Sequence, residues 1–334
     1  MDLNNKTVLV TGGAGSFGQQ FCRTVLKRYR PHKVIVFSRD EDKHFQMGHH
    51  PDFREHNDVM RYFIGDVRDV ERLETAFRGV DYVVHAAALK QIPTAEYNPF
   101  ECIRTNVHGA ENVVTAAIRA GVKRVIALST DKAVNPINLY GASKLASDKI
   151  FAAAKNLVGS GDPLFGVVRY GNVIGSRGSV VPLFARLIDE GAETLPVTDE
   201  RMTRFWITLQ QGVDFVLSCM EMMHGSEIFV PKIPSMKVVD LAHVLAPQIP
   251  VEFMGVRPGE KLHEAMVTED EARVGLELPD RYVIRSMLYH QQSGYHPEER
   301  ALPDGFRYTS DSNEEWLDDQ GMERLLRELG IYPP

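Results

Sequence analysis

The sequence predicts an α/β fold in which a doubly wound parallel sheet is joined to a smaller C-terminal substrate-binding lobe. Short β-branched apolar segments alternate strictly with helical segments as far as about Val173, which is typical of a parallel sheet covered by helices on both faces. After Val173, glycine and proline become frequent and the segments become shorter. We therefore expect a first domain over residues 1–173. We expect a second lobe over residues 174–334, at the strand carboxyl ends where such sheets bind ligands.

The individual elements follow from their composition. Short apolar runs predict six buried strands, which cover residues 6–12, 33–39, 60–66, 80–88, 122–130 and 164–173. The intervening segments predict helices over residues 16–29, 70–79, 101–121 and 140–156. A further helix is expected over residues 209–223, and we expect it to return to the first domain.

The composition is that of a globular protein and excludes several classes of partner. The chain has 334 residues, of which 43% are hydrophobic and 25% charged, and its net charge is -7. This charge argues against nucleic acid or an anionic membrane as a partner, so local cations must hold any anionic ligand. No apolar run reaches about 18 residues, so we expect no membrane-spanning helix. Cys22, Cys102 and Cys219 form neither a disulfide framework nor a zinc site, which favours a reduced, cytoplasmic setting.

A glycine-rich turn after the first strand predicts a dinucleotide site of the Rossmann type. In "TGGAGSFG", Gly13, Gly15 and Gly18 satisfy the GxGxxG spacing. Glycines let the backbone approach a pyrophosphate, and the following helix offers unpaired N–H groups to it. The alternative is a purely structural glycine turn. The turn residues that we expect to bind the cofactor are Gly12, Gly15, Ser16, Phe17 and Gly18.

The end of the second strand favours NADP over NAD. NAD-binding proteins usually carry an acidic residue there, whereas a cation suits the 2′-phosphate of NADP. This strand ends in Ser38 and Arg39, and Lys43 follows one helical turn later. Asp40 leaves an alternative open, because its carboxylate could bind a ribose hydroxyl, and Arg39 could then be a solvated loop residue. We predict NADP, bound by Ser38, Arg39, Asp40 and Lys43.

Two further strand ends complete the predicted cofactor site. Asp66 could accept a hydrogen bond from the adenine amino group, with Val67 against the ring. Ala86, Ala87 and Ala88 end the fourth strand and leave room for the middle of the cofactor, although small residues at this point could also serve close packing alone.

Tyr140 and Lys144 predict hydride chemistry. They stand four residues apart, on one face of a predicted helix, and follow the fifth strand and its terminal Ser129 and Thr130. A nearby lysine cation lowers the pKa of a tyrosine, so that the phenolate can take a proton from an alcohol while hydride leaves carbon. The alternative is a surface pair on a helix. The position after the fifth strand favours catalysis.

The glycine turn and the YxxxK pair resemble the extended short-chain dehydrogenase/reductase family. Longer stretches resemble its configuration-inverting UDP-N-acetylglucosamine 4,6-dehydratases, from about residue 3 to about residue 270. These stretches are "HAAALKQIPTAEYNPFECIRTNVHGAENV", "STDKAVNPINLYGASK", "RYGNVIGSRGSVVPLF", "TDERMTRFWIT", "KIPSMKVVDLA" and "GVRPGEKLHE". The resemblance implies a hydro-lyase of the pseudaminic acid or related surface-polysaccharide pathways. It also implies a homo-oligomer, at least a dimer.

The resemblance implies a three-step reaction. Tightly bound NADP⁺ oxidises C4 of the sugar, water is lost across C5 and C6, and hydride returns to C6 while C5 is reprotonated from the opposite face. The product is UDP-2-acetamido-2,6-dideoxy-β-L-arabino-hex-4-ulose, and the cofactor is regenerated in each cycle. Tyr140 would be the base for the C4 hydroxyl and Lys144 would orient the ribose, with Thr130 beside them. Lys132 is the candidate base for C5, and Asp131 the candidate acid for the leaving hydroxyl.

The Asp131–Lys132 pair raises two physical questions. A close Asp⁻/Lys⁺ pair favours the charged states, whereas a lysine base must be neutral and an aspartic acid protonated. The two groups can titrate as a coupled unit, so their protonation states stay open. Adjacent strand residues also point to opposite faces, so both can reach one sugar only if the chain turns there. The alternative is an ion pair on a surface loop.

The resemblance places the nucleotide sugar against the second lobe. Arg204, Arg257 and Lys261 are candidate diphosphate ligands, because guanidinium groups suit phosphate recognition, although each could be an ordinary surface residue. Glu260 could bind ribose hydroxyls. The predicted substrate contacts are Lys90, Asn172, Val181, Arg204, Arg257 and Glu260, and the predicted cofactor contacts also include Lys90, Tyr140, Lys144 and Val173.

Other readings remain open. A nucleotide-sugar C4 or C5 epimerase of the same fold would also use Tyr140 and Lys144, and a non-catalytic NADP-sensing protein would keep the glycine turn. His49 and His50 lack a third ligand nearby, so we expect no metal site. The segment after about residue 275, including "SMLYHQQSGYHPEERALPDG", departs from the resemblance, and its role stays open.

Overall fold

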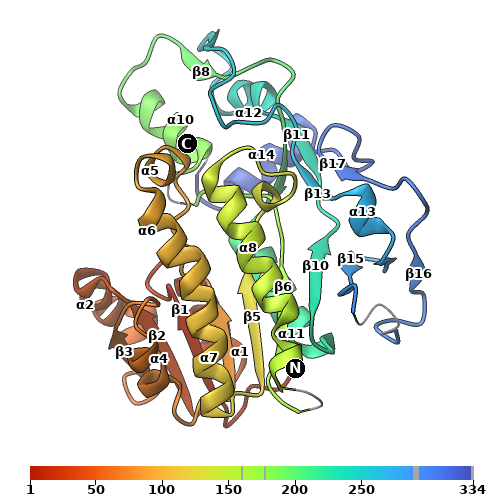
Figure 1. Ribbon diagram of the computed structural model, residues 1–334. Coiled ribbons are helices and arrows are strands. Elements are labelled where there is room, and N and C mark those ends of the chain that lie inside the picture. The colour runs from red at the N-terminus through yellow and green to blue at the C-terminus, as the bar shows by residue number, and fades with distance from the viewer. Residues whose placement is uncertain (159–160, 177, 289–292, 332–334) are drawn as a thin grey trace.

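The computed structural model describes residues 1–158, 161–176, 178–288 and 293–331 (Figure 1). Within these ranges the main sheet has ten strands, in the order β16-β14-β15-β10-β6-β5-β4-β1-β2-β3. The strands from β10 to β3 in that order run parallel, and β15, β14 and β16 extend one edge in antiparallel pairing. Their bounds are β1 Thr7–Thr11, β2 Lys33–Ser38, β3 Met60–Ile64, β4 Tyr82–His85, β5 Arg124–Leu128, β6 Leu164–Val168, β10 Glu227–Pro231, β14 Gly275–Glu277, β15 Arg281–Ile284 and β16 Arg300–Ala301.

Helices cover both faces of this sheet, as the alternating pattern predicts. Figure 1 shows α7 and α8 side by side on the face toward the viewer, with α1 and α11 behind the sheet. The longer helices are α1 Ser16–Arg28, α2 Glu41–His49, α4 Val70–Phe77, α7 Gly109–Ala120, α8 Leu139–Ala153, α10 Val180–Asp189, α11 Leu209–Met222, α12 Val238–Leu245 and α14 Asp319–Glu328. The short ones are α3 Pro51–Arg54, α5 Ile92–Tyr97, α6 Pro99–Ile103, α9 Lys155–Val158 and α13 Glu269–Ala272. The doubly wound architecture predicted from the sequence is confirmed.

The predicted strand over residues 164–173 is two strands in different sheets. β6 ends at Val168, and β7, Asn172–Val173, pairs with β9, Thr203–Ile207. Gly171 makes this crossing possible, because a Cβ atom there would lie 2.5 Å from the Cβ of Phe205. The chain therefore leaves the main sheet immediately before Asn172 and Val173. Small sheets complete the fold, with β11 Ser235–Lys237 beside β9, β8 Leu195–Val197 beside β12 Val251–Phe253, and β13 Ala265–Val267 beside β17 Tyr308–Thr309.

The predicted helix over residues 101–121 contains a π-helical turn. α6 passes through π-helical residues Arg104–His108 into α7. Asn106 in this turn accepts from the backbone N–H of Leu89 at 2.8 Å, and donates to the Leu89 carbonyl and the Ser143 hydroxyl at 2.9 Å each. Such turns occur often at functional sites. Here the turn fixes the loop after β4 to helix α8, which carries Tyr140 and Lys144.

Helix α11 packs against α1, as expected from the sequence. Gln20 donates a hydrogen bond to Gln210 at 2.8 Å, and Arg28 forms an ion pair with Asp214 at 2.5 Å. The main hydrophobic core therefore includes residues from both halves of the chain, for example Val8 from the first half and Val213 and Val283 from the second. A second core lies between α10, α12 and α14 and includes Phe184 and Leu241. The boundary at residue 173 stays a prediction.

The segment after residue 275, whose role the sequence left open, contributes strands to the main sheet. β14 and β15 pair antiparallel, β15 adds to β10, and β16 adds to β14. Residues 289–292 of the divergent stretch lie outside the described ranges. The sequences of β14, β15 and β16 are short and contain charged residues, so they show no long apolar run. This explains why these strands were not predicted.

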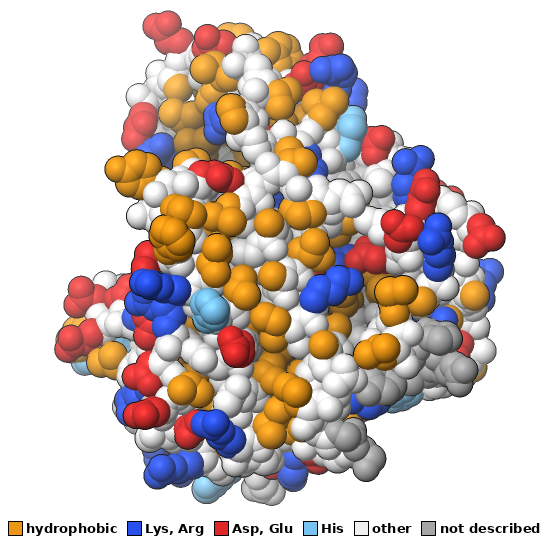
Figure 2. All heavy atoms as spheres, in the orientation of Figure 1, with side chains coloured by type: hydrophobic (Ala, Val, Ile, Leu, Met, Phe, Trp, Pro, Cys, Tyr) orange, Lys and Arg blue, Asp and Glu red, His pale blue; other side chains and the backbone are white. Residues whose placement is uncertain are grey.

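The face covered by α5 to α8 carries charges of both signs among hydrophobic side chains (Figure 2). Tyr97 on α5 and Phe100 on α6 are 87% and 75% exposed. None of the helices in the described ranges has both the length and the apolar character that crossing a membrane requires.

Candidate active site

The glycine turn after β1 lies tightly against the segment after β4. Gly12 has a φ of +65°, and a Cβ atom on it would lie 2.9 Å from the Cα of Ala87. A Cβ atom on Gly18 would lie 2.4 Å from the Cα of Gly13. Neither position has room for a side chain. Glycine at both positions therefore lets the turn stay tight and lets α1 begin close to the end of β1. The alanines thus serve close packing, and they also line the cavity described next.

A cavity of about 670 Å³ runs along the carboxyl ends of the parallel strands. Its wall brings together every residue that the sequence predicts to bind the cofactor. These residues are Gly12, Gly15, Ser16, Phe17, Gly18, Ser38, Arg39, Asp40, Lys43, Asp66, Val67, Ala86, Ala87, Ala88, Lys90, Tyr140, Lys144 and Val173. They lie at or after the ends of β1, β2, β3 and β4, in β7, and on helices α1, α2 and α8. The doubly wound topology places the ends of the parallel strands at one edge.

The two charged residues directly after β2, Arg39 and Asp40, have different surroundings. Asp40 is the N-cap of α2, because its Oδ1 accepts from the backbone N–H of Lys43 at 3.0 Å and its Oδ2 pairs with the Lys43 ammonium. These hydrogen bonds lower the pKa of Asp40. The Arg39 side chain is 53% exposed and lies 3.5 Å from Asp66. Both residues line the cavity, where the Asp40 carboxylate is engaged by Lys43 and the Arg39 side chain is the more exposed of the two.

Asp66, at the end of β3, is held mainly by Arg68. Its carboxylate accepts from the Arg68 backbone N–H at 3.0 Å and from the guanidinium at 2.6 and 2.9 Å. Burial raises the pKa of Asp66, but hydrogen bonding to Arg68 outweighs burial and the net pKa is lowered. A carboxylate in this state can accept a further hydrogen bond from a ligand.

Tyr140 and Lys144 lie buried on α8 at the inner end of the cavity. Burial raises the pKa of Tyr140 to about 12, against the opposing effects of the Lys132 charge and of a hydrogen bond with Thr130. The largest effect that lowers the Tyr140 pKa is the charge of Lys132. Lys144 donates to the Leu128 carbonyl at 2.6 Å, and burial lowers its pKa.

Asp131 and Lys132 lie in a 3-10 turn, Asp131–Ala133, directly after β5. The turn removes the strand alternation that would point them to opposite faces, and the Lys132 Nζ lies 3.0 Å from the Asp131 Oδ1. A Cβ atom on Gly141 would lie 2.1 Å from the Lys132 carbonyl oxygen, so only glycine lets α8 begin so close to this turn. The expected turn is therefore present, and it brings Lys132 beside Tyr140.

Lys132 lies where two cavities meet. It lines the cofactor cavity and a second cavity of about 570 Å³, as do Asn172, Gly178 and Ser179. Its ammonium is 3.4 Å from the Asn172 side-chain oxygen and 3.4 Å from the carboxylate of Glu264. Burial lowers the pKa of Lys132, but the charges of Asp131 and Glu264 outweigh burial and hold it above its usual value. Lys132 is therefore an ammonium in this arrangement.

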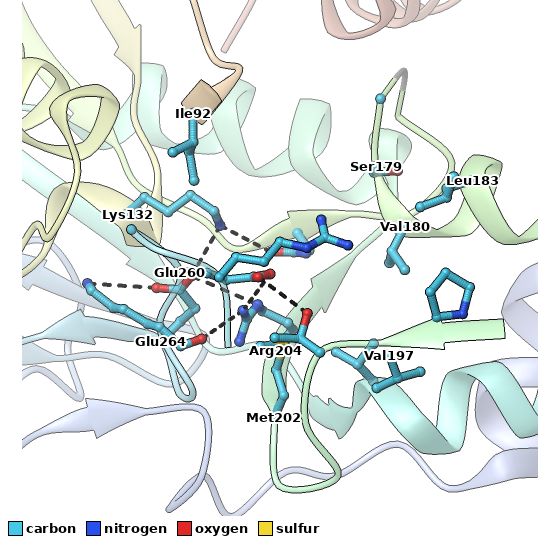
Figure 3. A pocket seen from close by; sticks show the side chains of 18 of the residues that line it. Ile92, Lys132, Ser179, Val180, Leu183, Val197, Met202, Arg204, Glu260 and Glu264 are labelled. Carbon is cyan, nitrogen blue, oxygen red and sulfur yellow. Dashed lines mark hydrogen bonds and ion pairs between the residues drawn. The ribbon is translucent and has the colours of Figure 1, made fainter. Parts of the chain in front are cut away.

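The wall of the second cavity includes several predicted substrate residues (Figure 3). Asn172, Arg257 and Glu260 line it, and Glu260 accepts from the Thr198 hydroxyl at 3.3 Å. Arg257 is exposed on the loop before Glu260. Lys90 lines the cofactor cavity, and its pKa is lowered by burial and then by the charge of Lys132.

Arg204 lines the second cavity, but its guanidinium is occupied by the protein itself. It donates to the backbone carbonyls of Thr203, Leu262 and Lys261 at 2.7, 3.0 and 2.9 Å. Its side chain is 6% exposed. These contacts do not support the prediction that its fork grips a diphosphate. The residue instead holds the backbone that carries Lys261 and Glu264.

The structure gives no geometric support to two further predicted site residues, Val181 and Asp131. Val181 is a core residue of α10 with no exposed surface, and its neighbours Val180 and Pro182 line the second cavity instead. A helix turns by about 100° per residue, so these neighbours can face the cavity while Val181 faces the core. Asp131 is fully buried and is not among the residues that line either cavity. Its predicted role as the acid has no direct geometric support.

Two charged residues of the second cavity were not predicted. Glu264 is the last letter of "GVRPGEKLHE", and its carboxylate lies beside Lys132. A lone glutamate before the apolar segment Ala265–Val267 was the one available signal. Arg186 on α10 also lines the cavity, but its place in an amphipathic helix resembles that of any surface arginine. His49 and His50, by contrast, serve local structure, since His49 contacts the Phe45 carbonyl and His50 caps α3.

Known proteins resemble this chain over most of its length. A UDP-N-acetylglucosamine 4,6-dehydratase (inverting) of Campylobacter jejuni is 53% identical over 333 residues, which cover 97% of this chain and 98% of that protein. A UDP-glucose 4-epimerase of Rickettsia conorii is 43% identical over 291 residues, covering 84% of this chain and 83% of the relative.

Solved structures share the fold. Pen from Bacillus thuringiensis has a TM-score of 0.90 and 35% sequence identity, with 99% of this chain and 100% of that chain covered. DesIV, a dTDP-glucose 4,6-dehydratase from Streptomyces venezuelae with NAD bound, has a TM-score of 0.67 and 25% identity, with 77% and 86% covered. Residues 8–286 match the family described as polysaccharide biosynthesis protein. The chain therefore belongs to this polysaccharide biosynthesis protein family, on a Rossmann-type fold.

Proposed function

We propose that this protein catalyses the NADP-dependent, configuration-inverting 4,6-dehydration of UDP-N-acetylglucosamine. The product would be UDP-2-acetamido-2,6-dideoxy-β-L-arabino-hex-4-ulose. The observation that carries the proposal is the position of Lys132, where the cofactor cavity and the second cavity meet, beside both Asp131 and the tyrosine of the YxxxK pair. The Campylobacter relative with the same named activity supports the assignment.

The residues divide the reaction into two parts. Bound NADP⁺ would accept a hydride from C4 and return it to C6. Tyr140 takes the proton of the C4 hydroxyl, and its hydrogen bond with Thr130 orients the phenol. Lys144, held by the Leu128 carbonyl, orients the cofactor ribose. Lys132 removes the C5 proton, which the C4 ketone acidifies, and a carboxylic acid beside it protonates the leaving C6 hydroxyl.

NADP is favoured over NAD by the contacts after β2. Asp40 also lines the cavity, but its carboxylate caps α2 and pairs with the Lys43 ammonium, which offsets its negative charge. The exposed Arg39 guanidinium and the Ser38 hydroxyl lie on the same part of the cavity wall, where a 2′-phosphate would be placed. Asp66 and Val67 would receive the adenine.

The second cavity would hold the nucleotide sugar. Arg257, on the loop before Glu260, and Arg186, on α10, line it, and unlike Arg204 both have exposed side chains. We assign the diphosphate to Arg257, with Arg186 near it. Glu260, Asn172 and Lys90 remain candidate contacts to the sugar and the ribose.

We further propose that the protein acts in the cytoplasm as a homo-oligomer in surface-glycan synthesis, such as that of pseudaminic acid. Three buried, unpaired cysteines support a reduced setting. Exposed Tyr97 and Phe100 offer an apolar surface to a second copy.

The test is product analysis of the purified protein with UDP-N-acetylglucosamine and NADP⁺. The proposal predicts a product lighter by the mass of water, about 18 mass units. An epimerase, the alternative favoured by the Rickettsia relative, would give a product of unchanged mass. A product of unchanged mass, or no conversion at all, would overturn the dehydratase assignment.

A further inference from the structure

Glu264 is a buried carboxylate in the wall of the second cavity. Its side chain is 3% exposed, and its Oε1 lies 3.4 Å from the Lys132 Nζ (Figure 3). Its Oε2 lies 3.8 Å from the Lys261 Nζ and has no hydrogen-bond partner among the described residues. Ser310 fixes the backbone of Glu264 from both sides, through hydrogen bonds of 2.9 and 2.8 Å. The Arg204 Nε lies 3.9 Å from Oε1 as well. Glu264 is thus a fixed carboxylate that faces Lys132, with one oxygen that makes no hydrogen bond among the described residues.

Lys132 needs an acceptor for its proton. Its ammonium faces oxygens of Asp131, Asn172 and Glu264, at 3.0, 3.4 and 3.4 Å. The other charged or titratable groups around it are Arg204, Lys90, Lys261 and Tyr140. An ammonium cannot remove a proton from carbon, and the side chain is only 24% exposed, so exchange with water is restricted. One of the two adjacent carboxylates must take the proton.

The geometry points to Glu264 as this acceptor. The Asp131 Oδ1 accepts from the Thr130 hydroxyl at 2.8 Å as well as from Lys132, and its Oδ2, like the Glu264 Oε2, has no hydrogen-bond partner among the described residues. Asp131, however, does not line either cavity. Glu264 lines the cavity in which the sugar would lie. We propose, on the basis of the function proposed above, that Glu264 relays a proton from Lys132 to the leaving C6 hydroxyl. Asp131 then positions Lys132.

The relay balances. Glu264 takes a proton from the Lys132 ammonium, which leaves a neutral amine and a carboxylic acid. The amine removes the C5 proton, and the C–H electron pair forms the C5–C6 double bond. The C6–O bond breaks, its electron pair leaves with oxygen, and the Glu264 carboxylic acid supplies the proton that completes a water molecule. Lys132 is again an ammonium and Glu264 a carboxylate, so the pair begins and ends each elimination in the same state.

The relay has a distinctive pH dependence. The pairs ammonium–carboxylate and amine–carboxylic acid hold the same number of protons, so their ratio does not change with pH while the pair keeps that count. If Glu264 is the acceptor, its removal leaves Lys132 to lose its proton to solvent. The fraction of neutral amine then rises about tenfold per pH unit below the lysine pKa. An Asp131 acceptor 3.0 Å away would instead keep the profile flat.

The experiment compares the wild-type protein with Glu264→Gln, Glu264→Asp and Asp131→Asn. Single-turnover dehydration of UDP-N-acetylglucosamine is followed from pH 6.5 to 9. We expect a flat profile for the wild type, and flat but slower profiles for Glu264→Asp and Asp131→Asn. Glu264→Gln should be slower by about 100-fold or more at pH 7, with KM unchanged, and should recover about tenfold per pH unit. A flat profile for Glu264→Gln, or a rising one for the wild type, would overturn the relay.

A second measurement does not need substrate. Competitive acetylation of Lys132, read by mass spectrometry, reports the pH at which its amine becomes neutral. Glu264→Gln should lower this midpoint by about 1 to 3 pH units, because a nearby carboxylate is lost. An unchanged midpoint contradicts the contact on which the relay depends. If the wild type yields no dehydrated product, the proposed function fails, whereas the midpoint still decides whether Glu264 controls the protonation of Lys132.

Discussion

Replacing Lys132 with methionine tests the site in two independent ways. The substitution keeps an unbranched side chain, shorter by one heavy atom, and removes its charge. At an effective dielectric constant of about 20, a charge pair 3.0 Å apart attracts by roughly 5 kcal/mol, and Lys132 has a second carboxylate at 3.4 Å. Desolvation offsets much of this attraction. We therefore expect Lys132→Met to lower the unfolding free energy by about 3 to 5 kcal/mol, the usual cost of removing one partner of a buried ion pair.

The cost falls mainly on Asp131. Glu264 keeps Lys261 and Arg204 at 3.8 and 3.9 Å, whereas Asp131 is fully buried and keeps the Thr130 hydroxyl. An uncompensated buried carboxylate can shed its charge by binding a proton. The destabilisation should therefore be larger at pH 8 than at about pH 5.

Urea denaturation of both proteins at the two pH values measures this cost, and deuterium incorporation at C5 measures the chemistry. We expect Lys132→Met to lose C5 exchange while it still binds NADP⁺. Tyr140→Phe is the matched control, since it should stop C4 oxidation without the pH-dependent loss of stability. Equal stability of Lys132→Met and wild type at both pH values, or retained C5 exchange, would refute the reasoning.

Three further predictions concern separate parts of the molecule. Arg39→Ala should weaken NADP⁺ binding by about 10-fold or more and leave NAD⁺ binding nearly unchanged, as measured by the two dissociation constants; an unchanged preference would contradict the NADP assignment. Arg257→Ala should raise KM for the nucleotide sugar by about 10- to 100-fold with little change in unfolding free energy, whereas Arg204→Ala should mainly lower that free energy, because Arg204 holds three backbone carbonyls. Burial lowers the pKa of His85 in the folded protein to about 3. Below about pH 6.5 the imidazole therefore binds a proton in the unfolded chain, whereas in the folded protein it stays neutral until the pH approaches 3. The unfolding free energy should then fall by up to about 1.4 kcal/mol per pH unit as pH decreases from 6.5 toward 4.5, and His85→Asn, which can still contact Thr11, should lose part of this slope.

Much of the fold could be predicted because parallel strands are apolar throughout. The segments that became β1, β2, β4, β5 and β6 are buried on both faces, and such runs stand out in any sequence. The antiparallel strands β14 to β16 are short and carry charged residues, so they gave no comparable signal. The crossing at Gly171 depends on Phe205, a contact between segments far apart in the chain.

The site could be predicted where a motif is local. The glycine turn and the YxxxK pair each lie within a single strand–turn–helix unit, so the spacing of their residues in the sequence determines how these residues lie relative to one another. The role of Arg204 could not be predicted from its identity, because two of its three backbone-carbonyl partners, those of Lys261 and Leu262, lie about 60 residues away in the sequence. Glu264 was missed for the same reason, since its contact with Lys132 joins segments 132 residues apart in the sequence.

The central claim is that one lysine removes the C5 proton of a sugar that Tyr140 has first oxidised. The most direct measurement is NMR analysis of the product formed from UDP-N-acetylglucosamine in D₂O. The account predicts a 4-keto-6-deoxy sugar with deuterium at C5 and inverted configuration at that carbon. A product with retained C5 configuration, or without deuterium at C5, would contradict it.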